Sequence, residues 1–183
     1  NGAVLVGVSE RTTSQGIERL ASRLFAGGKV NQIVAVEMNR TRAQMHLDTV
    51  MTMVDVGTFT IYGGLGKLST LTLRPDGDKQ ISVTRNAPED MYRIIAQALG
   101  VGELNVLITP QDSMAAAREQ WDDGSNSLAI APGVIVTYER NVNTNEYLTS
   151  HGIEVLTIPG SEVGRGRGGP RCMSCPTLRD PLA

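Results

Sequence analysis

Apolar runs and amphipathic segments alternate along the chain, a pattern typical of sheets covered by helices. Residues 3–8 form a short continuous apolar run, which indicates a strand buried on both faces. Residues 12–15 fit the capping-box pattern, apolar residues follow at helical spacing, and the two glycines at 27–28 end the helix. Residues 32–38 predict another strand, so the chain is predicted to open with strand, helix and strand.

The middle of the chain predicts a longer unit that closes with a helix and a returning strand. Its predicted strands are residues 49–54, 58–62, 68–73, 80–84 and 104–109. Pro88 is tolerated in a first helical turn, and the apolar face of that helix ends at Gly100. The predicted order is therefore two pairs of strands, one helix and one strand.

A third unit repeats this order in a shorter form. Residues 127–131 and 134–138 predict paired strands, residues 143–152 a helix, and residues 153–158 a strand. The predicted helices start near residues 13, 88 and 143, so the repeat is structural and has no fixed sequence period. We therefore expect an α/β fold of two ββαβ-like units and a truncated one, with more units upstream.

The composition is typical of a globular protein and argues against two classes of binding partner. Hydrophobic residues make up 40% of the 183 residues, and the net charge of -2 argues against nucleic acid or an anionic membrane surface. No apolar stretch reaches the ~18 residues that a membrane span needs, and no basic region precedes the apolar start. Two cysteines cannot form a disulfide framework. We expect a cytoplasmic protein without membrane contact.

The tail over residues 160–171 is rich in glycine and arginine. Its glycines at positions 164, 166 and 169 match a dinucleotide-binding pattern, but Pro170 follows at once where that fold needs a helix. An arginine–glycine tether for RNA would need stacking aromatic residues, which the tail lacks. Dense glycine instead indicates a backbone that comes close to a ligand.

Cys172 and Cys175 follow this tail and leave several interpretations open. A redox pair would sit early in the fold at a helix start, and structural zinc would need two more ligands at finger-like spacing. A single nucleophile is the third interpretation, because Arg171 and the arginines upstream would favour the thiolate of Cys172. An inert buried cysteine is the fourth.

His46 and Asp48 form the other concentration of reactive groups. If this segment is extended, both side chains point to one face while Leu47 points to the core. An imidazole and a carboxylate on one wall suit acid/base chemistry beside a cationic substrate, although a purely structural pair is equally compatible. His151 precedes Gly152 at a predicted helix end and is expected to be a surface residue.

Several segments together resemble bacterial arginine deiminases, in the same order along the chain. They are residues 10–13 (ERTT), 45–50 (MHLDTV), 121–124 (WDDG), 138–141 (YERN), 164–169 (GRGRGG) and 172–176 (CMSCP). The resemblance covers the whole chain, and it implies that residues 1–183 are the C-terminal part of a single catalytic domain. The N-terminal half is then a required partner, and we also expect a homo-oligomer.

The resemblance implies a five-bladed α/β propeller, the pentein fold of guanidine-modifying enzymes. It also implies hydrolysis of L-arginine to L-citrulline and ammonia without a metal or an organic cofactor. By matched position the site residues are Cys172 as nucleophile, His46 as general acid/base, Asp48 as the carboxylate that holds the guanidinium, Arg11 and Arg167 for the substrate carboxylate, and Gly166 where the backbone meets the substrate.

Pro170 and Arg171 depart from the family pattern, in which a small residue and a histidine commonly precede the nucleophile. A fixed cation there is expected to lower the pKa of the thiol. The alternative to the deiminase interpretation is a non-catalytic remnant, or a structural zinc or redox domain built on Cys172 and Cys175.

Overall fold

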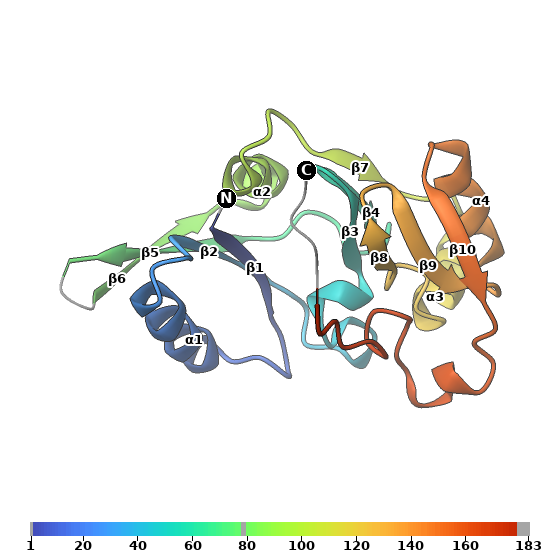
Figure 1. Cartoon of the computed structure of the whole chain (residues 1–183), viewed down its shortest axis with the longest axis horizontal. Coiled ribbons are helices and arrows are strands. Elements are labelled where there is room, and N and C mark those ends of the chain that lie inside the picture. Colours follow the sequence, from blue (N-terminus) through green and yellow to red (C-terminus); the bar gives the residue numbers. More distant parts are fainter. Residues whose placement is uncertain (1, 78–79, 179–183) are drawn as a thin grey trace.

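The computed structural model describes residues 2–77 and 80–178, whose strands form three sheets (Figure 1). The strands are β1 (Ala3–Val8), β2 (Gln32–Glu37), β3 (Met51–Asp55), β4 (Thr58–Ile61), β5 (Thr70–Asp76), β6 (Gln80–Asn86), β7 (Asn105–Leu107), β8 (Leu128–Ala131), β9 (Val134–Tyr138) and β10 (Glu154–Ile158). The α-helices are α1 (Ser14–Ala26), α2 (Met91–Leu99), α3 (Ser113–Trp121) and α4 (Val142–Ser150). Two short 3-10 helices are also used below. The first, η2 (Leu47–Thr49), follows His46, and the second, η4 (Val163–Gly166), lies in the glycine-rich tail before Cys172.

The first sheet has the strand order β1-β2-β5-β6. Strand β1 is parallel to β2, with α1 between them in the chain, as the opening pattern predicts. Because β2 is central, its alternating side chains enter two cores: Ile33 and Ala35 pack with α1, while Val34 and Val36 pack with α2. The β5–β6 hairpin joins β2 antiparallel, and Leu73 packs in the α1 core.

The prediction that residues 3–8 are buried on both faces is wrong. Most residues of β1 are only half-buried, because β1 pairs with β2 on one side and is the outermost strand of its sheet in the described residues. Gly7 is its buried position. Residues 3–7 of β1 line a cavity described below. The apolar run therefore forms part of a cavity wall as well as part of a core.

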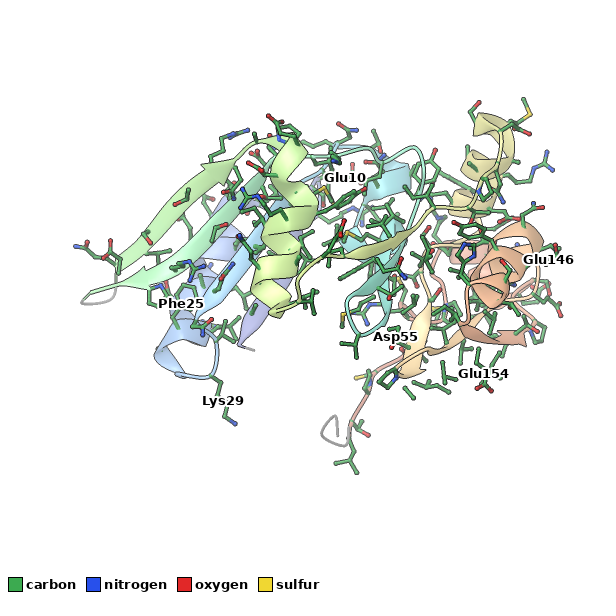
Figure 2. The ribbon with its side chains drawn as sticks, turned by 90° about the horizontal axis from the view of Figure 1, so that it is seen from above. Glu10, Phe25, Lys29, Asp55, Glu146 and Glu154 are labelled. Carbon is green, nitrogen blue, oxygen red and sulfur yellow. The ribbon has the colours of Figure 1, made fainter. Side chains whose placement is uncertain are left out.

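The second and third sheets confirm the structural repeat. Each has an antiparallel hairpin and a later strand, preceded by a helix, that pairs parallel with the second hairpin strand: β3-β4 with β7, and β8-β9 with β10. In the second sheet the β5–β6 hairpin comes between β4 and α2 in the chain. Helix α2 packs against both the first and the second sheet, and Figure 2 shows it beside the first sheet, facing the second. The described residues do not close into the five-bladed ring that the resemblance implies.

Helix α3 is absent from the sequence-based predictions. Its apolar periodicity is poor, because Glu119 and Gln120 are its buried residues while Met114 is exposed. The carboxylate of Asp112 nevertheless caps the helix and accepts hydrogen bonds from the backbone amides of Met114 and Ala115 at 2.9 Å each. In the sequence, the indication of this helix is Asp112, a residue type that is favoured at the N-cap position of helices.

Candidate active site

The segment with His46 and Asp48 is a tight turn, which corrects the expectation of an extended segment. Leu47 begins η2, and the hydroxyl of Thr49 donates to the carbonyl oxygen of His46 at 2.7 Å. The turn lies close to β1: an added Cβ on Gly7 would lie 3.1 Å from Cβ of Leu47. A larger residue at Gly7 would first meet the sulfur of Met38, at 2.6 Å, and would also press on the turn.

His46 and Asp48 nevertheless share one cavity, as predicted. The cavity has a volume of about 490 Å³ and lies between β1, α2 and β3. Leu47 lines it too, and this side chain also packs against the main core. The cavity is mostly apolar, with His46, Asp48 and Arg171 as its charged or titratable wall. Such a wall suits a ligand with an apolar stem and a cationic head.

The guanidinium of Arg171 forms a salt bridge with the carboxylate of Asp48. Its Nε lies 3.1 Å from Oδ2 of Asp48, and both side chains are partly exposed. The other oxygen, Oδ1, is buried and has no hydrogen-bond partner in the residues that the structure describes. Asp48 therefore holds one guanidinium through one oxygen and keeps a second oxygen unused.

Cys172 lies at the end of the tail, and its side chain is exposed. Its backbone amide donates to Oδ1 of Asn126 at 3.1 Å. Desolvation by the surrounding protein raises the pKa of the Cys172 thiol, and the carboxylates of Asp48 and Asp123 raise it further; hydrogen bonds from Gly169 and Asn126 act in the opposite direction without cancelling the rise. The expectation that neighbouring arginines lower this pKa is therefore wrong for the described chain, because Arg171 is turned to Asp48.

Arg167 lies away from the cavity, over the indole of Trp121. The distance from its Cζ to the ring centroid is 4.2 Å, and Nη2 lies 3.6 Å from Oδ1 of Asp123. Its side chain is 15% exposed, and none of its guanidinium nitrogens has a hydrogen-bond partner among the described residues. Its backbone has φ 67°, a left-handed conformation that is costly for a residue other than glycine.

The two remaining predicted residues are also outside the cavity. Arg11 is exposed and pairs with Glu10 at 3.1 Å. Gly166 is exposed at the end of η4, with open space where a Cβ would be. The structure thus gathers His46, Asp48 and the segment of Cys172, while Arg11, Gly166 and Arg167 remain predictions for the substrate-carboxylate end.

Sequence reasoning missed the polar residues that hold these segments. Asp123 is buried and accepts the backbone amide of Gly168 at 2.9 Å, and its own burial raises the pKa of its carboxyl despite Arg167 nearby. Asn126 contacts both functional segments. Asp123 lies in the WDDG segment at residues 121–124 that contributes to the resemblance, and the signal for Asn126 is the cluster of polar residues that follows Trp121.

Glu119 is the anchor of α4. Its carboxylate is 7% exposed and accepts hydrogen bonds from Gln111, from the amides of Asn143 and from the amide and hydroxyl of Thr144, the last at 2.5 Å. Burial alone would raise the pKa of this carboxyl, but the hydrogen bonds outweigh it and the pKa is lowered. The ionised form is therefore the one that the fold stabilises.

Replacing Glu119 by glutamine should lower the free energy of unfolding by about 1–3 kcal/mol, because an amide cannot accept from all these donors and leaves some of them unpaired. Since the folded pKa is lowered, this stabilisation is present above the ordinary pKa of about 4.5 and is lost as pH falls through the folded value. Urea unfolding at neutral and acidic pH measures both effects.

Glu146→Gln is the matched control, since Glu146 is an exposed residue of α4 (Figure 2). It should leave the free energy of unfolding almost unchanged. Equal effects of the two substitutions would show that Glu119 does not anchor the helix.

A zinc centre on the two cysteines would need further ligands. In the described ranges, 2–77 and 80–178, no three or more His, Cys, Asp or Glu side chains come together in a way that could hold a metal ion. Over the same ranges, none of the helices is both long and apolar enough to cross a membrane.

Solved structures of low sequence identity share this fold. ArgZ, an arginine dihydrolase from the ornithine-ammonia cycle in cyanobacteria, matches with a TM-score of 0.60 at 15% identity, over 96% of this chain and 23% of that chain. SxtG, an amidinotransferase from Microseira wollei in a saxitoxin biosynthetic pathway, matches with a TM-score of 0.61 at 15% identity, over 93% and 43%. The chain therefore has the mixed α/β fold of these pentein structures.

Sequence comparisons are more specific. The chain is 52% identical over 184 residues to the arginine deiminases of Mycobacterium tuberculosis (strain ATCC 25618 / H37Rv) and Mycobacterium marinum (strain ATCC BAA-535 / M). These alignments cover 99% of this chain and 44% of each relative, so the chain spans less than half their length. A family model described as arginine deiminase matches residues 1–179. The chain belongs to the arginine deiminase family.

Proposed function

We propose that this chain is the C-terminal part of an arginine deiminase, which converts L-arginine to L-citrulline and ammonia. One observation carries the proposal: Asp48, on the wall of a cavity shared with His46, already holds a guanidinium, that of Arg171. A substrate guanidinium would take the same oxygen and the unused Oδ1. A carboxylate that binds a guanidinium edge-on through two oxygens gives strong and directional binding.

The chemistry then follows from the residue types. The thiolate of Cys172 adds to the central guanidinium carbon, ammonia leaves with a proton from His46, and a covalent amidino-cysteine remains. His46 next takes a proton from water, which attacks the same carbon and releases citrulline and the thiol. Because the Asp48 and Asp123 carboxylates raise the pKa of the Cys172 thiol, a cationic substrate at Asp48 would offset part of that rise.

The carboxylate end of arginine needs cationic partners. Arg167 is mostly buried and has unpaired guanidinium donors, which supports its proposed role there. The stacking on Trp121 covers the face of this guanidinium, while its N–H donors point outward in the plane of the group. Arg11 and the backbone at Gly166 would complete this end, and the remaining half of a five-bladed propeller would supply further carboxylates. A homo-oligomer and a cytoplasmic location stay predictions from the sequence.

The experiment uses a completed enzyme, in which residues 1–183 follow the part of the Mycobacterium tuberculosis relative that this chain does not cover. We expect equal amounts of citrulline and ammonia from L-arginine, and an amidino adduct on Cys172 in the mass spectrum of the quenched protein. Stoichiometric bound zinc without citrulline would support the alternative of a domain built on Cys172 and Cys175, and would contradict the proposal.

Arg171 competes with substrate in this account. Arg171→Ala in the completed enzyme should lower KM for arginine by about 1.4- to fivefold, because an exposed ion pair of this kind contributes about 0.2–1 kcal/mol. Arg171→Lys should lower KM less, since the cation is retained. Steady-state kinetics measures both, with Arg165→Ala as control, because Arg165 is an exposed tail arginine paired with Glu162. An unchanged KM for Arg171→Ala would show that Arg171 does not compete.

A further inference from the structure

A single buried asparagine joins the two segments that carry the proposed nucleophile and the proposed guanidinium carboxylate. Asn126 has 0% of its surface exposed. Its Nδ2 donates to the backbone carbonyl of Asp48 at 2.7 Å, and its Oδ1 accepts the backbone amide of Cys172 at 3.1 Å. Asp48 and Cys172 are far apart in the chain, so this side chain fixes the distance between them.

The segment around Asn126 is itself fixed to the turn of Asp48. The hydroxyl of Thr52 donates to the carbonyl of Ser125 at 2.6 Å and lies 3.2 Å from the carbonyl of Asp48. The carbonyl of Asp48 therefore accepts from Asn126 and lies next to the hydroxyl of Thr52. Neither contact involves the carboxylate of Asp48, which pairs with Arg171.

The tail packs tightly against Asn126 on its other side. A Cβ added to Gly169 would lie 2.5 Å from Oδ1 of Asn126, closer than side chains come. The glycine at 169 therefore lets the tail reach the asparagine, and Cys172 follows one turn later, where the amide of Met173 donates to the carbonyl of Gly169 at 3.1 Å.

We propose that Asn126 is a positioning residue, which sets the placement of the Cys172 thiol relative to the carboxylate of Asp48. This inference rests on the proposed deiminase function and adds a residue to it. Asn126 touches no substrate in this account and acts through the two backbones that it binds and through its side chain beside the Cys172 thiol. The hydrogen bond from Asn126 also counters part of the rise in the pKa of the Cys172 thiol.

Asn126→Asp is the test variant, because it keeps the shape and the acceptor for the Cys172 amide but, when ionised, cannot donate to the carbonyl of Asp48. It also adds a negative charge near the Cys172 thiol, so Asn126→Ser, which removes the connection without adding a charge, is measured beside it and should lower kcat in the same direction. In the completed enzyme we expect kcat to fall by about 10²-fold with KM changed by less than about threefold, since misplacement of reacting atoms affects the transition state most. The pH profile of Cys172 alkylation, measured in a Cys175→Ser background, should move to higher pH.

Asn145→Asp is the matched control. Asn145 is also buried, donates to a backbone carbonyl, that of Tyr138, and accepts a hydrogen bond from Thr137, but it contacts neither functional segment. It should keep kcat and the alkylation profile of the parent protein, whatever it does to stability. If Asn126→Asp does not fold, Thr52→Val loosens the same connection and should lower kcat in the same direction.

Several outcomes would overturn the inference. One is a kcat within about twofold of the parent enzyme for Asn126→Asp. Another is an equal loss of kcat in Asn145→Asp with an unmoved alkylation profile, which would assign Asn126 a structural role only. If the completed enzyme forms no citrulline, the proposed function fails, and alkylation of the 183-residue chain alone still decides whether Asn126 controls the thiol.

Discussion

Cys172→Ser is expected to abolish citrulline formation by the completed enzyme, while Cys175→Ser keeps most of it. A serine hydroxyl is a far weaker nucleophile than a thiolate at neutral pH, so the covalent step should become undetectable. Cys172 is the cysteine tied to the Asp48 segment through Asn126, and its neighbour Arg171 lines the cavity. Cys175 is an exposed residue beyond that connection. Citrulline release under saturating arginine measures both variants.

The pair of substitutions separates the interpretations left open by the sequence. A loss confined to Cys172 supports a single nucleophile. An equal loss from both substitutions would contradict it and return the paired-cysteine interpretation.

His46 and Asp48 should show the next largest effects. His46→Ala is expected to lower kcat by about 10²-fold or more, the usual contribution of a positioned acid/base. Asp48→Ala should lower kcat and raise KM together, because Asp48 both holds the guanidinium and orients it for attack. The bridging carbonyl of Asp48 belongs to the backbone and stays in place, so the loss reports on the carboxylate.

The chain offers a control for each. His151 is exposed just after α4. Asp55 is the last residue of β3 (Figure 2), and its carboxylate accepts a hydrogen bond from the backbone amide of Val56. Neither lines the cavity of His46. His151→Ala and Asp55→Ala should leave kcat/KM almost unchanged. Arginine turnover untouched by Asp48→Ala would mean that the guanidinium site lies elsewhere.

The repeat of strands and helices could be predicted because apolar runs and turn residues act locally. Strand β2 and the hairpins of the second and third sheets were accessible in this way. Helix α3 was not, because its buried face is polar: Glu119 and Gln120 are satisfied by partners elsewhere in the chain, such as Thr144. The attachment of β5–β6 to the first sheet is a long-range pairing that no local pattern specifies.

In the candidate site, too, residues close together in the sequence could be predicted, and residues brought together by long-range packing could not. His46 and Asp48 lie two positions apart, so the sequence predicts a shared wall for them, although the segment is a turn and not extended. Asn126 lies 78 positions from Asp48 and 46 from Cys172, so the polar cluster around it does not reveal that it joins these two segments. The orientation of Arg167 toward Trp121 likewise depends on packing that only the folded chain provides.

The central claim is that these residues form part of a deiminase site that another part of the enzyme completes. One carboxylate can pair with one edge of a guanidinium and leaves it free to pivot, and a shift of about 1 Å can cost ~10²-fold in rate. The outer edge of β1 beside the cavity also has no strand partner in the described residues, which leaves the cavity wall open.

Citrulline release by the 183-residue chain tests this claim most directly, measured alone and after mixing with the separately expressed remainder of the Mycobacterium tuberculosis relative. We expect no citrulline from the chain alone, and release when the two parts associate, with no release when the chain carries Cys172→Ser. Turnover by the monodisperse chain alone, at the rate of the completed enzyme, would contradict the account.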